Sequence, residues 1–264
     1  MGYRFKRKIE LIMINKKSQK TDQRNSRNHK ENLSASVLFT FTPKIEYLMY
    51  MLQKGIVPRY CYERLPGSEK GYIAPMKCFC DIPLSKIKYH MERYGYYGIG
   101  LKKSFLRKQG ATPVIYVHAK SILVKNIIKR NSSQIDYSSI LPLLKRYDGD
   151  DYRFNNYNKL SSKKRIYFYD EQEWRYLPPN FNCGMSNPFK KIELGVSTAN
   201  KMNRENPFFQ NCFEIPPNAI EYIIINKNRE LAFLIESLKK IYKESDIETI
   251  LTKVQIADKI LRDF

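Results

Sequence analysis

Hydrophobic and polar positions follow two patterns along the chain, short apolar runs typical of strands and the spacing of one helical face. The first clear example of both lies near residue 40. Val37–Phe41 is a short apolar run typical of a strand, and apolar residues between Ile45 and Leu52 then recur at the spacing of one helical face. We expect Thr42 to cap this helix, with Pro43 at its first position. Gly55 stands where a glycine commonly ends a helix. The pattern predicts a strand, a turn and a helix.

The same two patterns predict further strands and helices along the rest of the chain. Strands are expected at Lys77–Cys80, Tyr97–Leu101, Pro113–His118, Arg165–Tyr169, Glu171–Leu177 and Ala219–Ile225, and helices at 84–94, 119–147, Arg229–Tyr242 and Ala257–Phe264. Loops are expected at 147–164 and 198–206. Strands and helices mix without a regular βαβ alternation. The pattern therefore predicts an α+β fold, with a mixed, mainly antiparallel sheet core and flanking helices.

The beginning of the chain has a different composition from the rest. Residues 15–36 hold almost no apolar side chains, so we expect residues 1–36 to form a flexible basic leader. Residues 37–264 are then a single α+β domain. The chain has no run of 18 or more apolar residues, so no membrane-spanning helix is expected. The odd number of cysteines, five, favours a reducing compartment, and we expect a cytoplasmic protein.

The net charge of the chain indicates which kinds of molecule it could bind. The chain has 47 Lys and Arg against 26 Asp and Glu, which gives a net charge of +21. Such a field attracts nucleic acid, anionic nucleotides or an acidic protein partner. The alternative is that the charge reflects the composition of the lineage, because Lys, Asn, Ile and Tyr are all abundant here. Charge alone leaves both interpretations open.

The first candidate for chemistry is the run EQEWR at residues 171–175. In an extended chain Glu171 and Glu173 point to one face, where their mutual repulsion raises their pKa values unless Arg175 compensates. A glutamate in such a place can bind a ribose hydroxyl or stabilise an oxocarbenium ion. The alternative is a surface strand in which Arg175 simply pairs with a glutamate and Trp174 anchors the strand.

The second candidate is the run FTFT at residues 39–42. Thr40 and Thr42 share one face of the predicted strand, and hydroxyls beside a helix start can contact a phosphate or ribose. His90 lies on a predicted helix, either in the core or in the lining of a pocket. Cys78 and Cys80 do not have the usual spacing of zinc ligands, so no metal site is expected.

Several segments then resemble a known family, in strict order over residues 37–178. They are LFTFT (38–42), QKGIVPRYCYE (53–63), APMKCFCDIPL (74–84), HMERYGYYGIGL (90–101), TPVIYV (112–117) and YDEQEWRYLP (169–178). This order resembles the AbiGi family, the first protein of a two-gene abortive-infection system for phage resistance, described as an antitoxin. The resemblance implies a phage-defence protein that binds the cognate toxin from a neighbouring gene.

A more distant resemblance concerns mechanism. A strand with hydroxyls, a helix ending in Leu-x-x-Gly and a later E-x-E motif are similar to the ADP-ribosyltransferase fold of the DarT type. The resemblance implies that Thr40 and Thr42 contact NAD and that Tyr96 or Tyr97 stacks on nicotinamide. It also implies that Glu173 is the catalytic glutamate. The chain departs from the pattern at Thr40, where that family has histidine.

Three functions follow from these patterns. The first is an antitoxin or regulator of a toxin–antitoxin pair. The second is an NAD-dependent ADP-ribosyltransferase acting on nucleic acid or protein, in which Glu171 would orient the acceptor. The third is a basic nucleic-acid-binding domain without catalysis. The enzyme hypothesis requires Thr40, Tyr97 and Glu173 to line one pocket.

Overall fold

The computed structural model describes residues 35–68, 70–129, 140–154, 160–179, 192–205 and 212–263. The chain divides into two units, Met1–Ser34 and Ala35–Phe264. Nearly all of the predicted leader therefore lies outside the described residues. The description below concerns the second unit.

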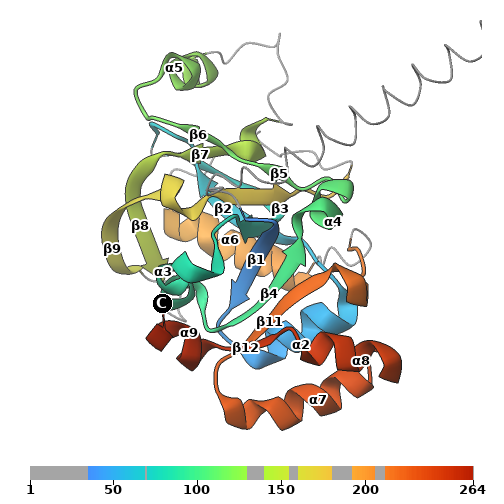
Figure 1. Cartoon of the computed structure of the whole chain (residues 1–264). Helices are drawn as coiled ribbons and strands as arrows, with labels where there is room; N and C mark the ends of the chain where they lie inside the picture. The colour runs from blue at the N-terminus through green and yellow to red at the C-terminus, as the bar shows by residue number, and fades with distance from the viewer. Residues whose placement is uncertain are drawn as a thin grey trace, which may run out of the picture. The chain divides into compact units, whose positions relative to one another are not determined.

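An eight-stranded sheet lies at the centre of this unit, in the order β12-β11-β4-β1-β3-β10-β5 with β2 also paired to β3 (Figure 1). The strands are β1 (Val37–Thr42), β2 (Arg59–Arg64), β3 (Gly71–Cys80), β4 (Tyr97–Lys102), β5 (Thr112–Pro113), β10 (Glu173–Tyr176), β11 (Ile220–Ile225) and β12 (Val254–Ile256). Strands β11 and β12 run parallel, and the other pairs are antiparallel. The predicted α+β class with a mainly antiparallel sheet is confirmed.

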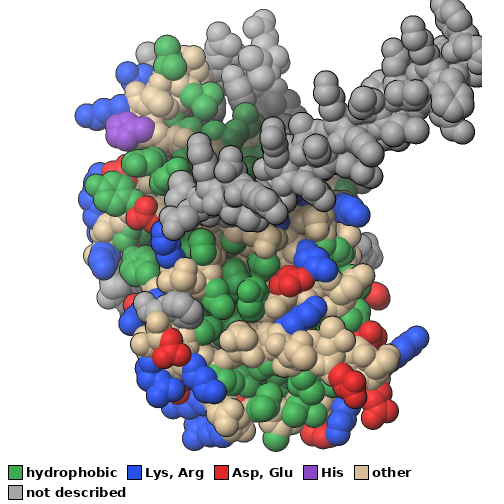
Figure 2. Space-filling view, viewed as in Figure 1, with side chains coloured by type: hydrophobic (Ala, Val, Ile, Leu, Met, Phe, Trp, Pro, Cys, Tyr) green, Lys and Arg blue, Asp and Glu red, His purple; other side chains and the backbone are tan. Residues whose placement is uncertain are grey.

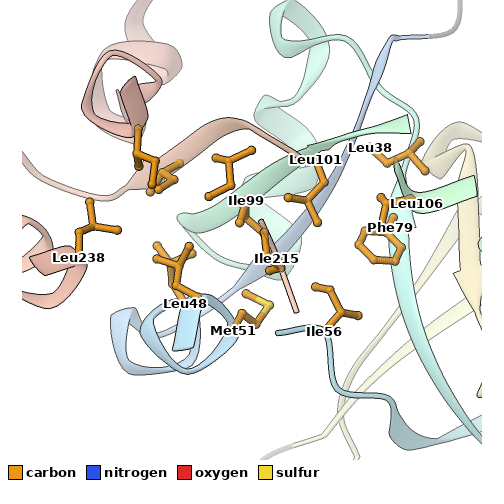
Figure 3. Packing of buried hydrophobic residues seen from close by; sticks show 14 of the residues in the cluster. Leu38, Leu48, Met51, Ile56, Phe79, Ile99, Leu101, Leu106, Ile215 and Leu238 are labelled. Carbon is orange, nitrogen blue, oxygen red and sulfur yellow. The ribbon is translucent and has the colours of Figure 1, made fainter. Parts of the chain in front are cut away.

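Helices flank the sheet, and the largest apolar core lies between the sheet and the helices near its β11 end. The helices are α2 (Ile45–Lys54), α3 (Lys88–Tyr94), α4 (Lys103–Lys108), α5 (Ile122–Lys129), α6 (Ile192–Glu205), α7 (Leu231–Lys239), α8 (Glu244–Leu251) and α9 (Ala257–Asp263). Leu48 and Met51 of α2 and Leu238 of α7 pack with Ile99 and Leu101 of β4 (Figure 3). This packing fixes the positions of the central strands, which carry other residues on their opposite face.

The start of α2 differs from the prediction. Strand β1 continues through Thr42, and the N-cap of the helix is Lys44. No side chain forms a capping hydrogen bond at this N-terminus. Thr42 is therefore a strand residue, and its predicted capping role is wrong. Gly55 does end the helix, with φ 81° and its N–H donated to Met51. This backbone conformation favours glycine, as expected.

Two regions predicted as loops are regular structure. Residues 147–164 contain strand β8 (Asp148–Phe154) and most of strand β9 (Leu160–Tyr167), which form a hairpin. Residues 198–206 fall largely within α6. The hairpin pairs charged residues across its strands, such as Asp150 with Arg165. Opposite charges stabilise such pairs, but they leave no apolar pattern in the sequence. A second small sheet joins β6 (Ile115–Val117) to β7 (Leu144–Arg146).

Candidate functional site

A cavity of about 300 Å³ lies where two central strands separate. In the described chain β1 and β3 are paired at Phe39 and Cys80 alone, and the two strands part beyond this pair. Strands β1, β2, β3, β7 and β10, helix α3 and the 3-10 turn before β10 all contribute to its lining. The lining residues are Phe39, Thr40, Phe41, Arg59, Cys61, Glu63, Met76, Lys77, Cys78, Phe79, His90, Tyr94, Lys145, Glu171 and Glu173. Three of the predicted site residues, Thr40, Glu171 and Glu173, are among them.

The register of the sheet separates two of these three residues. Phe39 and Glu173 both pair with Cys80, so their side chains lie on the same face of the sheet. Thr40 follows Phe39, and its side chain therefore lies on the opposite face, with Leu38. Thr40 therefore borders the cavity from the face of the sheet opposite to Glu173.

The other three predicted residues lie outside this cavity. The Tyr97 hydroxyl donates a hydrogen bond to Glu230 at 2.7 Å, and Tyr97 lines a separate cavity of about 410 Å³ beside the start of α2. Tyr96 packs against the apolar cluster that contains Phe39. Thr42 is buried and does not contribute to the lining. The structure thus does not bring Thr40, Tyr97 and Glu173 into one pocket.

Helix α3 supplies two cavity residues, His90 and Tyr94, so of the two positions predicted for His90 it occupies the pocket lining. His90 and Tyr94 are four residues apart, so they lie on one face of the helix. The His90 ring is 4.5 Å from the Tyr94 ring and 5.7 Å from the Phe41 ring, centroid to centroid. Burial, and then the nearby Arg93, lower the pKa of His90 to about 4. His90 is therefore a neutral pocket residue at pH 7, and its spacing from Tyr94 was the available signal.

The two glutamates reach the cavity by a route other than the predicted extended strand. Glu171 ends a 3-10 turn (Phe168–Glu171), Gln172 has a left-handed conformation with φ 43°, and β10 begins at Glu173. The backbone turns at Gln172, so alternation along a strand does not explain why both carboxylates line the cavity. Their convergence depends on the turn.

Glu173 is held as a carboxylate by two cations. Nε of Arg175 donates to Oε1 at 2.6 Å, and Nζ of Lys145 lies 3.1 Å from Oε2. Burial alone would raise the pKa of Glu173, but Arg175 and Lys145 lower it below its usual range. Arg175 is completely buried and also lies 3.2 Å from Glu63. The predicted pairing of Arg175 with a glutamate is present, but in the interior rather than on the surface.

Glu171 has a different environment, although it lines the same cavity. It pairs with Arg93 and accepts a hydrogen bond from the Tyr94 hydroxyl at 2.9 Å. Burial raises the pKa of Glu171, and the cations Lys145 and Arg93 offset only part of this effect. The two carboxyl groups therefore have pKa values shifted in opposite directions. Opposed shifts of this kind are typical of sites with separate acid and base roles.

A second cavity of about 470 Å³ adjoins the first. Glu63, Tyr94 and Lys145 line both cavities, so the two share a wall. The second cavity is more highly charged, with Arg64, Arg93, Arg146, Asp150 and Asp151 also in its lining, together with Tyr62, Tyr152, Phe168 and Val196. Together the cavities offer an aromatic end and a charged end.

The described residues contain no group of three or more His, Cys, Asp or Glu side chains placed to hold a metal ion. Among the described helices, none has the length and apolarity needed to cross a membrane. On the face in Figure 2, basic and acidic side chains are interspersed, with Lys and Arg gathered at the lower left near α9.

Comparisons with known proteins place the chain in a family. A family model described as "Putative abortive phage resistance protein AbiGi, antitoxin" matches residues 54–226. The "Abortive phage resistance protein AbiGi" of Lactococcus lactis subsp. cremoris is 31% identical over 131 residues, and the match covers 41% of this chain and 53% of that protein. The chain thus spans about half the length of the curated relative that it matches. No solved structure matches the chain, so an ADP-ribosyltransferase-like fold stays a prediction. The chain belongs to the AbiGi family.

Proposed function

We propose that this protein acts in abortive phage resistance, in the cytoplasm, as an antitoxin that binds and restrains a toxin from a neighbouring gene. The observation that carries the proposal is the family match over residues 54–226, whose description names both phage resistance and an antitoxin. The matched range includes most of the residues that line the two cavities. The net charge of +21 suits a partner with an acidic surface.

A tyrosine patch offers a surface for that partner. Tyr147, Tyr167 and Tyr169 are 39%, 61% and 46% exposed, and the Tyr147 ring contacts both of the others. Tyrosine is enriched at protein interfaces because it combines a large apolar ring with a polar tip. The Tyr169 ring also contacts Tyr116, whose hydroxyl accepts a hydrogen bond from the Glu173 N–H at 2.7 Å. The patch is thus linked to the cavity.

The test is co-expression with the product of the neighbouring gene, with growth as the measurement. The intact chain should rescue growth, and Tyr167→Ala combined with Tyr169→Ala should reduce the rescue. Tyr47→Ala is the matched control, since Tyr47 is 47% exposed and lies on α2 outside the patch and the family match. Absence of rescue by the intact chain contradicts the antitoxin role. Equal rescue by all variants contradicts the assignment of the patch.

A second candidate function is transfer of ADP-ribose from NAD. One observation favours it: Glu171 and Glu173 line one cavity and have opposite pKa shifts. An ionised Glu173 in a buried site could stabilise positive charge that develops on a ribose ring. The expected NAD contacts fit less well, because the Thr40 side chain lies on the other face and Tyr97 lies elsewhere. We therefore derive no catalytic step through NAD.

Incubation with NAD and candidate acceptors separates this candidate from the antitoxin role. Consumption of NAD by the intact chain, lost in Glu173→Gln and retained in the exposed-site variant Glu236→Gln, would support transfer. If NAD is not consumed while growth rescue is intact, the enzyme candidate is wrong and the antitoxin proposal stands.

A further inference from the structure

The charged cavity contains a guanidinium, that of Arg146, whose charge is not paired by any carboxylate in the described part of the chain. Arg146 of β7 donates from Nη2 to the Asp150 carbonyl at 3.0 Å, and no carboxylate among the described residues forms an ion pair with it. Burial, and then the neighbouring Arg64, lower the pKa of Arg146. Arg64 and Arg146 thus line one cavity, where Arg146 keeps the positive charge that a bound anion would neutralise.

Two other cations beside this cavity, Arg93 and Lys145, have carboxylate partners. Arg93 pairs with Glu171 and lies 2.9 Å from Asp151. Lys145 lies between Glu63 and Glu173, at 3.6 and 3.1 Å. A ligand that entered the cavity would have to compete with these partners for Arg93 or Lys145. It would meet no such competition at Arg146.

The ring of Phe168 keeps the cations in place without neutralising them. Arg146, Lys145 and Arg93 lie 4.9, 5.1 and 5.6 Å from the ring centroid, and Phe168 is 5% exposed. Cation–π attraction orients a charged group but leaves its charge available to an anion. Arg64 is oriented similarly, since its Nη1 donates to the Tyr152 hydroxyl at 2.8 Å and its guanidinium lies over the Tyr152 ring.

The adjoining cavity is suited to a planar group. Phe41, His90 and Tyr94 form an aromatic wall there, and His90 is neutral at pH 7. Tyr94 also lines the charged cavity, so the aromatic wall and the arginines lie on the two sides of one shared residue. The two volumes, about 470 and 300 Å³, are of the size that small-molecule sites have.

We infer that the paired cavities bind a nucleoside diphosphate, with Arg146 and Arg64 on the diphosphate and the base against Phe41, His90 and Tyr94. Arginine suits this role because its planar fork donates two parallel hydrogen bonds to a phosphate. The inference goes beyond the antitoxin proposal, because toxin binding requires no nucleotide. It also requires no turnover of NAD.

Calorimetric titration of the purified full chain with ADP, sodium pyrophosphate and adenosine tests the inference. ADP should bind, and adenosine should bind at least about tenfold more weakly, since it lacks the anionic group. Arg146→Gln should weaken ADP binding by about tenfold or more. Arg107→Gln, at an exposed position of α4, should bind ADP like the parent chain.

A second measurement covers the case in which Arg146→Gln fails to fold. In the unaltered chain, ADP and pyrophosphate should protect Arg146 from an arginine-specific reagent, as read by mass spectrometry, while Arg107 reacts unchanged. The inference is wrong if ADP does not bind, whether or not pyrophosphate does, or if folded Arg146→Gln binds ADP like the parent. It is also wrong if a single-stranded oligonucleotide binds the same cavity more tightly than ADP.

Discussion

The completely buried guanidinium of Arg175 donates to the carboxylate of Glu173 at 2.6 Å, two residues away on the same strand. A second donation, from Nη1 to the Pro142 carbonyl at 2.5 Å, connects β10 to the segment that precedes β7. Arg175 therefore joins the central sheet to the element that carries Lys145. Removal of the Arg175 guanidinium should therefore lower the stability of the fold and also change the surroundings of Glu173 in the cavity.

Arg175→Met should lower the free energy of unfolding by about 3 kcal/mol or more, because it leaves the buried Glu173 and the partly buried Glu63 with only Lys145 between them. Urea denaturation followed by circular dichroism measures the change. Arg107→Met, at an exposed site, should stay within about 0.5 kcal/mol of the parent. A loss below about 1 kcal/mol in Arg175→Met would show that the ion pair is not structurally required.

The two glutamates should respond differently to the same substitution. Glu173→Gln should destabilise the protein more than Glu171→Gln, by at least about 1 kcal/mol. The reason is that two cations lower the pKa of Glu173, whereas burial raises the pKa of Glu171 and so favours its neutral form. Paired urea titrations at pH 7 compare them. Equal losses, or a larger loss for Glu171→Gln, would contradict the opposite directions of the two pKa shifts.

His90 should make stability depend on pH in acid. Its pKa is about 4 in the folded protein and 6.5 in the unfolded chain, so the unfolded state binds more protons between these values. Stability should therefore be retained above pH 6.5 and decline by about 3 kcal/mol as the pH falls to 4. Glu171 opposes part of this decline, since burial raises its pKa.

The difference between the parent and His90→Gln isolates this contribution. Thermal unfolding from pH 7 to pH 4 should show a flatter pH dependence in His90→Gln. His118→Gln, at an exposed histidine, should keep the slope of the parent. Parallel curves for the parent and His90→Gln would remove the basis for a buried neutral imidazole.

Gly98 allows the Phe41 ring to lie over strand β4. A Cβ at Gly98 would come within 2.7 Å of that ring, and Phe41 in turn contacts His90. Gly98→Ala should therefore cost about 1–3 kcal/mol and displace the aromatic wall. Adding Phe41→Leu should recover part of the loss by making room. If the double variant is no more stable than Gly98→Ala in thermal unfolding, crowding against Phe41 is not the cause.

The elements that the sequence predicted well are those with a strong local apolar pattern. Strand β11 and the final helix α9 lie close to the expected ranges Ala219–Ile225 and Ala257–Phe264. The β8–β9 hairpin was missed because its strands pair through charges such as Asp150 with Arg165. Helix α6 was missed because its sequence has few large apolar residues.

The sequence predicted some of the residues that line the candidate site, but it did not predict how the backbone brings them there. Glu171 and Glu173 do share a cavity, but through a left-handed turn at Gln172 that their spacing does not reveal. The face that Thr40 occupies depends on the register of Phe39 with Cys80, which is a long-range pairing. Such pairings are set by the whole sheet, so a local pattern cannot supply them.

The strand order has a consequence for the time at which the protein can work after its synthesis begins. Strand β4 pairs with β1 on one side and with β11 on the other, and β11 begins about 120 residues after β4 ends. At typical ribosome speeds this delay is roughly ten seconds. During that interval the growing chain exposes an unpaired strand edge, so chaperone binding to nascent chains should concentrate between the synthesis of β4 and that of β11.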